Sequence, residues 1–232
     1  MRIWAILPAA GIGRRFGSAL PKQYLNLCGI PVILHAITRL LELQEIEKVI
    51  VSLHPDDQYW YGLNIETPKV ETVLGGDERS DSVANALESL EGIAEDTDWV
   101  AVHDAVRPCL STSDLKKIIS ELKDENIGGI LASPIVDTLK KTDENMKITK
   151  TLDRNQVWSA LTPQIFRYDI LKKALTVQRE RSSVATDEAG AVEALGYQPR
   201  IIPGEPTNIK ITEEKDLALA EHIILSQAER SC

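Results

Sequence analysis

Residues 7–24 read Leu7-Pro-Ala-Ala-Gly-Ile-Gly-Arg-Arg-Phe-Gly-Ser-Ala-Leu-Pro-Lys-Gln-Tyr24, and they combine small residues, glycines and cations directly after an apolar run. That run, residues 3–7, is typical of a short buried strand. Glycines let a backbone approach a ligand closely and present several N–H donors together. Arg14, Arg15 and Lys22 add positive charge to the same segment. The combination suits a polyphosphate, because its oxygens accept hydrogen bonds from backbone N–H groups and from cations.

Two familiar glycine loops do not fit this segment. The dinucleotide fingerprint G-x-G-x-x-G requires a glycine three residues after Gly13, but Phe16 stands there and the third glycine is Gly17. The Walker loop requires Gly-Lys-Ser or Gly-Lys-Thr, and no such tripeptide follows Gly13. The spacing leaves a phosphate-binding loop of another kind, or a tight strand-to-helix turn with solvated arginines.

Strands and helices are predicted to alternate up to residue 133. Apolar spacing and β-branched runs predict strands over 48–53, 70–74, 99–103 and 128–133, and helices over 31–43, 81–90 and 111–126. This alternation indicates a mostly parallel, doubly wound, Rossmann-like α/β sheet. Such sheets bind ligands beyond the carboxyl ends of their strands. The first loop, the polar loop 75–80 and Asp104 each follow a predicted strand, so we expect them to meet at one rim.

Residues 135–158 interrupt the alternation. Two extended runs, 135–141 and 147–154, are separated by the polar residues 142–146, which is typical of a hairpin arm. An isolated two-stranded hairpin is marginally stable in water, so we expect the arm to pack against something else. From Ser159 the helical pattern resumes, and the remaining predicted elements are helices over 168–177 and 187–195, a strand over 200–202, and a final helix capped by Thr212 and ending near residue 228.

Composition narrows the class of protein. The 232 residues fit one domain, 1–232, with the arm included. A net charge of −9 argues against a general nucleic-acid binder, although locally concentrated cations still allow a small anionic substrate. Cys28, Cys109 and Cys232 show no C-x-x-C spacing, which favours reduced thiols in the cytoplasm. The first apolar stretch is too short for a signal peptide and contains Pro8, and no stretch of the sequence is long enough to span a membrane.

The segments Pro8-Ala-Ala-Gly-Ile-Gly-Arg-Arg15 and Pro21-Lys-Gln-Tyr24 resemble the signature loop of the 2-C-methyl-D-erythritol 4-phosphate cytidylyltransferases of non-mevalonate isoprenoid synthesis. The resemblance continues in a fixed order over almost the whole chain, through Gly75-Gly-Asp-Glu-Arg79, His103-Asp-Ala-Val-Arg-Pro108, Asp153-Arg-Asn155, Leu161-Thr-Pro-Gln164, Thr186-Asp-Glu188 and Asn208-Ile-Lys210. It implies a nucleotidyltransferase that transfers CMP from CTP to 2-C-methyl-D-erythritol 4-phosphate. The products would be 4-diphosphocytidyl-2-C-methyl-D-erythritol and pyrophosphate, formed by in-line attack of the substrate phosphate on the α-phosphate.

The resemblance also implies roles for individual residues. Arg15 and Lys22 would be catalytic, by stabilising the charge on the attacked phosphate. The residues implied for nucleotide binding are Ala9, Ala10, Gly11, Gly13, Gly76, Asp77 and Ser82. The residues implied for substrate positioning are Arg107, Thr138, Arg154, Thr162, Thr186 and Lys210. Ordinary alternatives remain open: solvated surface cations for Arg15 and Lys22, and helix capping by a residue of the 80–82 segment.

Asp104, at the end of a predicted strand, is the expected metal ligand. Magnesium usually takes one or two carboxylates and keeps phosphates and water as its other ligands, so one aspartate suffices for Mg²⁺ or another divalent cation. The alternative is a buried carboxylate paired with Arg107. The histidines lack zinc-ligand spacing, so His103 is expected to pack or to form hydrogen bonds. Cys109 has no adjacent histidine that would support a nucleophilic role.

The implied reaction needs no protein base, because the second pKa of a phosphate monoester is near 6. Catalysis would consist of positioning and charge neutralisation. Two alternatives stay open: a ribitol-5-phosphate cytidylyltransferase and a non-catalytic nucleotide-binding module. In the resembled family the arm crosses to a second subunit, which implies a homodimer in which Arg154 serves the partner's active site. Some members carry a fused cyclase, and this second activity is not expected here.

Overall fold

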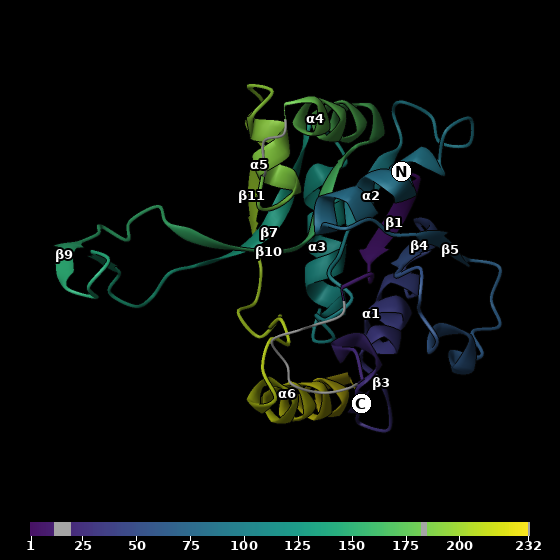
Figure 1. Ribbon diagram of the computed structural model, residues 1–232, viewed down its shortest axis with the longest axis horizontal. Helices are drawn as coiled ribbons and strands as arrows, with labels where there is room; N and C mark the ends of the chain where they lie inside the picture. Colours follow the sequence, from purple (N-terminus) through teal and green to yellow (C-terminus); the bar gives the residue numbers. More distant parts are fainter. Residues whose placement is uncertain (12–19, 182–184, 232) are drawn as a thin grey trace.

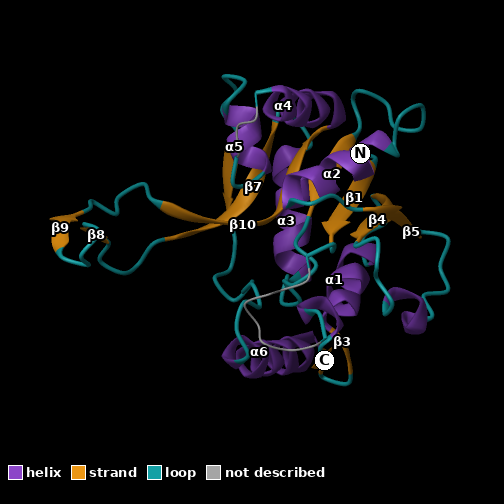
Figure 2. Ribbon diagram, in the orientation of Figure 1, coloured by secondary structure: helices purple, strands orange, loops and turns teal. Residues whose placement is uncertain are grey.

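One sheet contains strands from both halves of the chain. The computed structural model describes residues 1–11, 20–181 and 185–231. In that part of the chain the seven-stranded sheet has the order β11-β7-β10-β6-β1-β4-β5 (Figures 1 and 2). Its strands are β1 (Ile3–Pro8), β4 (Ile46–Leu53), β5 (Val70–Leu74), β6 (Trp99–Val102), β7 (Gly128–Pro134), β10 (Trp158–Arg167) and β11 (Arg200–Pro203). Strand β10 runs antiparallel to β6 and β7, while the other pairings are parallel, so the mostly parallel sheet is confirmed.

Helices cover both faces of this sheet. They are α1 (Val32–Leu41), α2 (Arg79–Glu88), α3 (Thr112–Leu122), α4 (Tyr168–Glu180) and α5 (Glu188–Glu193), while α6 (Lys215–Ser231) lies to one side of the sheet. In β1, Ile3, Ala5 and Leu7 pack with α1 and α3, whereas Trp4 and Ile6 pack with α2 and α4. Successive strand side chains point to opposite faces, so β1 is buried on both sides, as expected for a doubly wound sheet. No helix in the described part of the chain is both long enough and apolar enough to cross a membrane.

A smaller layer forms beside the sheet where the chain ends. Strands β2 (Asn26–Leu27) and β3 (Ile30–Pro31) form a short hairpin directly after the 3-10 helix η2 (Lys22–Tyr24). Helix α6 packs on this hairpin through an apolar cluster that includes Leu27, Cys109 and Ala220 (Figure 1). A second 3-10 helix, η3 (Trp60–Leu63), lies between β4 and β5. The cluster therefore packs the C-terminal helix against the segment that follows Lys22.

The prediction was wrong at residues 158–167. No strand was predicted there, yet β10 occupies the middle of the sheet. Pro163 disfavours a central strand, because proline cannot donate to the ladder. The structure accommodates it at an irregularity in the pairing with β7, between Ala160 and Gln164. The predicted cap at Thr212 was also wrong: α6 begins at Lys215, and the Thr212 hydroxyl donates instead to the Asp216 carboxylate at 2.8 Å.

The predicted hairpin arm projects away from the sheet (Figure 1). Its strands, β8 (Lys140–Thr142) and β9 (Ile148–Thr151), are shorter than the two extended runs that the sequence predicts. Both strands are exposed along their whole length. The arm continues β7 and β10, and a backbone hydrogen bond of 3.1 Å from Ile135 to Val157 closes its base.

Candidate active site

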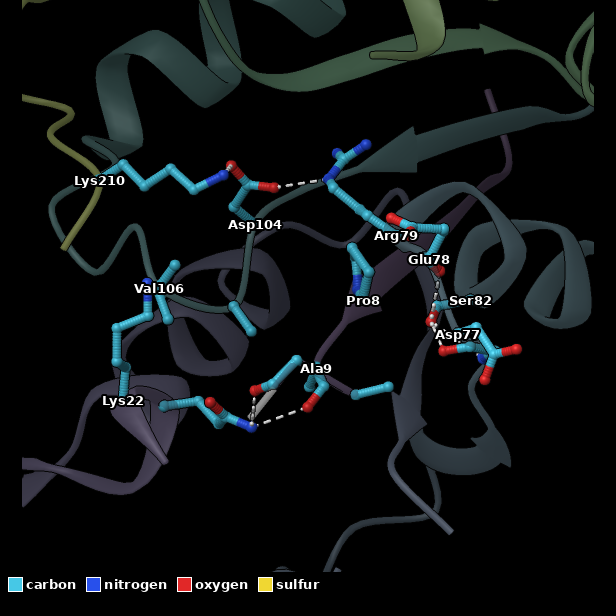
Figure 3. Close-up of a pocket in the computed structure, with 15 residues that line it drawn as sticks. Pro8, Ala9, Lys22, Asp77, Glu78, Arg79, Ser82, Asp104, Val106 and Lys210 are labelled. Atoms are coloured by element: carbon cyan, nitrogen blue, oxygen red, sulfur yellow. Dashed lines mark hydrogen bonds and ion pairs between the residues drawn. The ribbon is translucent and has the colours of Figure 1, made fainter. Parts of the chain in front are cut away.

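The segments after β1, β5 and β6 meet at the carboxyl-end rim of the sheet. Together with η2 and the segment before α6, they line a cavity of about 190 Å³ (Figure 3). The convergence predicted from the strand pattern is therefore present. The cavity contains nine of the residues singled out from the sequence: Ala9, Ala10, Gly11, Lys22, Gly76, Asp77, Ser82, Asp104 and Lys210.

One wall of the cavity depends on glycines after β5. A Cβ on Gly75 would lie 2.4 Å from the Cβ of Ala10, so a side chain there would prevent the two loops from approaching. The Gly76 N–H donates to the Oγ of buried Ser82 at 3.1 Å. The N-cap of α2 is Glu78 rather than a residue of the 80–82 segment. Ser82 thus fixes the loop after β5 instead of capping the helix.

The opposite wall depends on η2. Buried Gln23 donates from Nε2 to the carbonyl oxygens of Ala9 at 2.7 Å and Gly11 at 3.3 Å. Lys22, one residue earlier, donates from Nζ to the carbonyl of Ile211 at 3.2 Å. The Gln23 amide therefore holds the entrance of the glycine-rich loop, and the Lys22 ammonium lies on the cavity wall.

Asp104 holds three cations, of which Arg79 and Lys210 are drawn in Figure 3. Its Oδ1 accepts from Nε of Arg79 at 3.0 Å, and its Oδ2 contacts Nζ of Lys210 at 3.0 Å and Nε of Arg107 at 3.3 Å. Burial alone would raise the pKa of this carboxyl, but Arg79, Lys210 and Arg107 hold it well below its usual range. Asp104 is therefore ionised at neutral pH, and the pair with Arg107 is present as one of three.

Arg79 connects Asp104 to a second carboxylate. Its Nη1 and Nη2 donate to Oε1 and Oε2 of Glu188 at 2.6 and 3.0 Å. Burial would lower the pKa of Arg79, but the Glu188 and Asp104 carboxylates outweigh it and raise the value. Two carboxylates thus face three cations, Arg79, Arg107 and Lys210, with the Lys22 ammonium on the same cavity. Within the cluster around Asp104 and Glu188, the three cations outnumber the two carboxylates, which suits an anionic ligand. Asp77 and Glu78 also line the cavity, so this excess is confined to the cluster.

His103 and Thr162 lie beneath the cavity and hold the Asp104 backbone. The Thr162 hydroxyl accepts from the Asp104 N–H at 3.2 Å and is 2.9 Å from Nδ1 of His103. Nε2 of His103 lies 3.0 Å from the Arg107 carbonyl, which can only accept, so Nε2 carries the ring proton. Burial lowers the pKa of His103 to about 4. The prediction that His103 forms hydrogen bonds is confirmed, and the Thr162 hydroxyl forms hydrogen bonds with Asp104 and His103 inside the protein.

The other singled-out residues lie elsewhere. Thr138 and Arg154 are exposed on the arm, where Arg154 donates to the Val136 carbonyl. Thr186 is exposed just before α5. Gly13 and Arg15 lie outside the described residues.

Sequence reasoning gave no role to Gln23, Arg79 or Glu188. Each stands inside one of the motifs that carry the family resemblance: Gln23 follows Lys22, whereas Arg79 and Glu188 stand two residues after Asp77 and Thr186. That proximity was the available signal. Their burial and pairing were not visible, because Arg79 and Glu188 are 109 residues apart in the chain.

Asp104 fits a divalent cation with a single protein ligand. Among the described residues, no three His, Cys, Asp or Glu side chains form a metal-binding group. An ionised carboxylate offers about four acceptor positions, and the three cations use three of them. One position remains for a cation such as Mg²⁺, whose other ligands would be phosphates and water.

Known proteins are similar to this chain in sequence and in fold. A family model described as 2-C-methyl-D-erythritol 4-phosphate cytidylyltransferase matches residues 3–226. A curated protein of that name from Dechloromonas aromatica is 47% identical over 226 residues, which cover 96% of this chain and 97% of that protein. Another, from Haemophilus ducreyi, is 45% identical over 230 residues, which cover 99% of this chain and 99% of that protein. The crystal structure of the Francisella tularensis protein of that name has a TM-score of 0.84 at 32% identity, covering 96% of this chain and 100% of its own. The chain belongs to the 2-C-methyl-D-erythritol 4-phosphate cytidylyltransferase family.

Proposed function

We propose that the cavity at the carboxyl-end rim transfers CMP from CTP to 2-C-methyl-D-erythritol 4-phosphate. Family membership supports the two substrates. The observation that carries the proposal is one cavity whose walls combine glycine-rich backbone with the cations Lys22, Arg79 and Lys210. Backbone N–H groups and cations together match the oxygens of a triphosphate.

The reaction joins two anions. An oxygen of the substrate phosphate attacks the α-phosphorus of CTP, the bond from that phosphorus to the bridging β-phosphate oxygen breaks, and pyrophosphate leaves. The attacking phosphate is already mostly a dianion at neutral pH, so no base is required. His103 is unsuited to that task, because it is buried and hydrogen-bonded at both ring nitrogens. The chain's contribution is to align the two phosphates and offset their charge.

The cavity walls suggest a division of labour. Lys22 is the described cation assigned to the charge that develops on the attacked phosphate, and Arg15 has the same predicted role outside the described residues. Lys210 and Arg107 flank Asp104 on the side assigned to the polyol phosphate. The nucleotide is assigned to the part of the lining formed by Ala9, Ala10, Gly11, Gly76, Asp77 and Ser82.

Asp104 is the residue that would hold Mg²⁺ or another divalent cation. When bound, such a cation neutralises phosphate charge and orients phosphate oxygens. Arg79, Arg107 and Lys210 keep the Asp104 carboxylate ionised and fixed in direction.

The arm supports assembly as a homodimer. Val136, Met146 and Ile148 are 74%, 80% and 65% exposed on it, which is unusual for large apolar side chains on an element with no core of its own. A second copy of the chain would cover them. Thr138 and Arg154, which lie on the same arm, would then serve the partner's active site.

Subunit mixing tests this assembly. Lys22→Ala and Arg154→Ala chains should each be inactive alone. If Arg154 acts in trans, a mixed dimer holds both lesions in one site and none in the other, so random 1:1 assortment restores roughly a quarter of wild-type activity. No recovery after verified exchange, or a monomer by sedimentation at working concentration, would contradict the proposal.

The substrates are tested by pyrophosphate release with each nucleoside triphosphate and with either 2-C-methyl-D-erythritol 4-phosphate or ribitol 5-phosphate. We expect CTP with the methylerythritol phosphate to exceed every other pair in kcat/KM. A preference for ribitol 5-phosphate would assign the protein to the alternative transferase reaction. Nucleotide binding without pyrophosphate release from any pair would favour the non-catalytic alternative.

The thiols Cys28 and Cys109 are unpaired, which supports the cytoplasm as the proposed compartment.

A further inference from the structure

We propose that Glu188, which lies outside the cavity lining, is a positioning residue for the transfer site: it orients the Arg79 guanidinium and, through Arg79, the Asp104 carboxylate. The inference rests on the proposed function, because it adds a residue to the same site. It concerns Oδ1 of Asp104, the carboxylate oxygen that Arg79 contacts, whereas Arg107 and Lys210 contact Oδ2.

The geometry fixes Arg79 from two directions. Glu188 accepts from both Nη atoms, at 2.6 and 3.0 Å, and the remaining Nε donates to Oδ1 of Asp104 at 3.0 Å. Because a guanidinium is planar, holding both Nη atoms also sets the direction of Nε. The Arg79 side chain is 29% exposed at the cavity wall, whereas Glu188 is 1% exposed behind it. Glu188 therefore acts on the cavity only through Arg79.

Glu188 is itself fixed by the sheet. It is the first residue of α5, whose N-cap Asp187 accepts from the Gly190 N–H at 2.9 Å. Buried Gln164 on β10 donates to Asp187 at 2.8 Å and accepts from the Ala189 N–H at 2.9 Å. The residues on both sides of Glu188, Asp187 through its side chain and Ala189 through its backbone, are therefore attached to the strand that runs beside β6, which ends just before Asp104.

The charges indicate what the loss of Glu188 would do. Without it, the Nη groups of Arg79 would be free to turn toward Asp104 or toward an anion in the cavity. A guanidinium that binds both Asp104 oxygens would occupy the last acceptor position of that carboxylate. The cavity and its other cations would remain, so turnover should fall more than nucleotide binding. A purely structural ion pair between α2 and α5 would instead change stability alone.

The kinetic test uses Glu188→Gln in the full-length chain, with pyrophosphate release as the assay. We expect kcat to fall about 10- to 100-fold, the range for slight misplacement of reacting groups. KM for CTP should stay within about threefold, because ground-state contacts are retained. Unchanged kcat would overturn the inference.

A double-mutant cycle tests whether Glu188 acts through Arg79. In an Arg79→Gln background, adding Glu188→Gln should change kcat by less than about twofold, because both substitutions remove one shared contact. Two effects that multiply independently would overturn the inference.

The matched control is Asp98→Asn. Asp98 is also buried and also accepts from two arginine nitrogens, Nε and Nη2 of Arg2, at 2.8 and 2.6 Å, but it lies at the opposite end of the sheet. Its loss should leave kcat within about twofold of wild type, because it touches no residue of the cavity. An equal loss of kcat in both variants would show a general effect of removing a buried carboxylate and would overturn the inference.

A spectroscopic measurement separates this inference from the proposed function. The Arg79 Nε–H signal in ¹⁵N NMR should exchange slowly with water in the wild type and in Asp98→Asn, and rapidly in Glu188→Gln. If the glutamine variant does not fold, Glu188→Asp, which keeps the charge but shortens its reach, should show the same change. An unchanged Arg79 signal in a folded Glu188 variant would reject the positioning role. A wild-type protein that releases no pyrophosphate would reject the proposed function whatever the signal shows.

Discussion

The two ends of the central sheet each contain a buried aspartate in an ion pair, and the surroundings of the two carboxylates differ. At the amino end, Oδ2 of Asp98 accepts from Arg2, from the Trp4 indole at 3.0 Å and from the Glu95 N–H at 3.0 Å. Burial would raise the pKa of Asp98, but these donors lower it. The Arg2 guanidinium contacts Asp98 and also lies 3.6 Å from the exposed Glu95 carboxylate, so no positive charge is left over there.

At the carboxyl end, Asp104 meets Arg79, Arg107 and Lys210, and Glu188 balances one of these cations. The remaining positive charge is confined to this cluster, which lies at one side of a cavity that Asp77 and Glu78 also line. The comparison shows that a buried carboxylate alone does not mark a site. What marks it is an unbalanced set of charges at the end of a parallel sheet where loops converge.

The largest effect is expected from Lys22→Met, which removes a cation from the cavity wall. Turnover should fall about 10²- to 10³-fold, the usual cost of losing one donor that stabilises transition-state charge. CTP binding should weaken much less, and comparing kcat with the CTP dissociation constant checks this. Near-normal kcat would remove Lys22 from the mechanism.

Asp104→Asn should raise the Mg²⁺ requirement, because an amide is a poor ligand for a hard cation. Activity at limiting Mg²⁺ is expected to fall about 10- to 100-fold or more, as for lost metal-site contacts. The fold should remain intact by circular dichroism. If activity at limiting Mg²⁺ is unchanged, the carboxylate only holds its three cations together.

Asp98→Asn should lower the stability of the protein and leave its turnover unchanged. It removes the negative charge of the buried carboxylate that Arg2 contacts and leaves the exposed Glu95 carboxylate beside Arg2, so the free energy of unfolding should drop by about 1–3 kcal/mol. Urea denaturation measures this loss, and kcat should stay near the wild-type value. A large kinetic defect with unchanged stability would contradict the division between the two ends.

Because of His103, the stability of the folded protein should decrease in acid. Its pKa is about 4 in the folded protein, below the ordinary 6.5, because burial disfavours the charged ring. Its contribution to stability is therefore complete above pH 6.5 and is lost as the pH falls toward 4, since the unfolded chain takes up the proton first. The total loss of stability over this pH range is about 3 kcal/mol. Urea titrations of the wild type and His103→Asn between pH 7 and pH 4 should diverge least at the acid end, and parallel curves would refute the assignment.

The sequence predicts the parallel half of this molecule better than the rest. Strands such as β4 and β5 are recognisable because they are apolar on both faces or bounded by turns, and their order places the loops at one rim. Strand β10 was not predicted, because Pro163 within it argues against a central strand. The Arg79–Glu188 pair escaped because single-sequence periodicity reports local burial and carries no information on contacts between distant segments.

The central claim is that the cavity beside the cation cluster at the carboxyl end of the sheet catalyses CMP transfer. ³¹P NMR of the protein with CTP, 2-C-methyl-D-erythritol 4-phosphate and Mg²⁺ tests it directly. The account predicts equal amounts of pyrophosphate and of a new diphosphate with two coupled phosphorus signals, in the wild type and in Asp98→Asn, and formation of both about 10²- to 10³-fold slower in Lys22→Met. Orthophosphate with CDP, or no change in the wild-type spectrum, would contradict it.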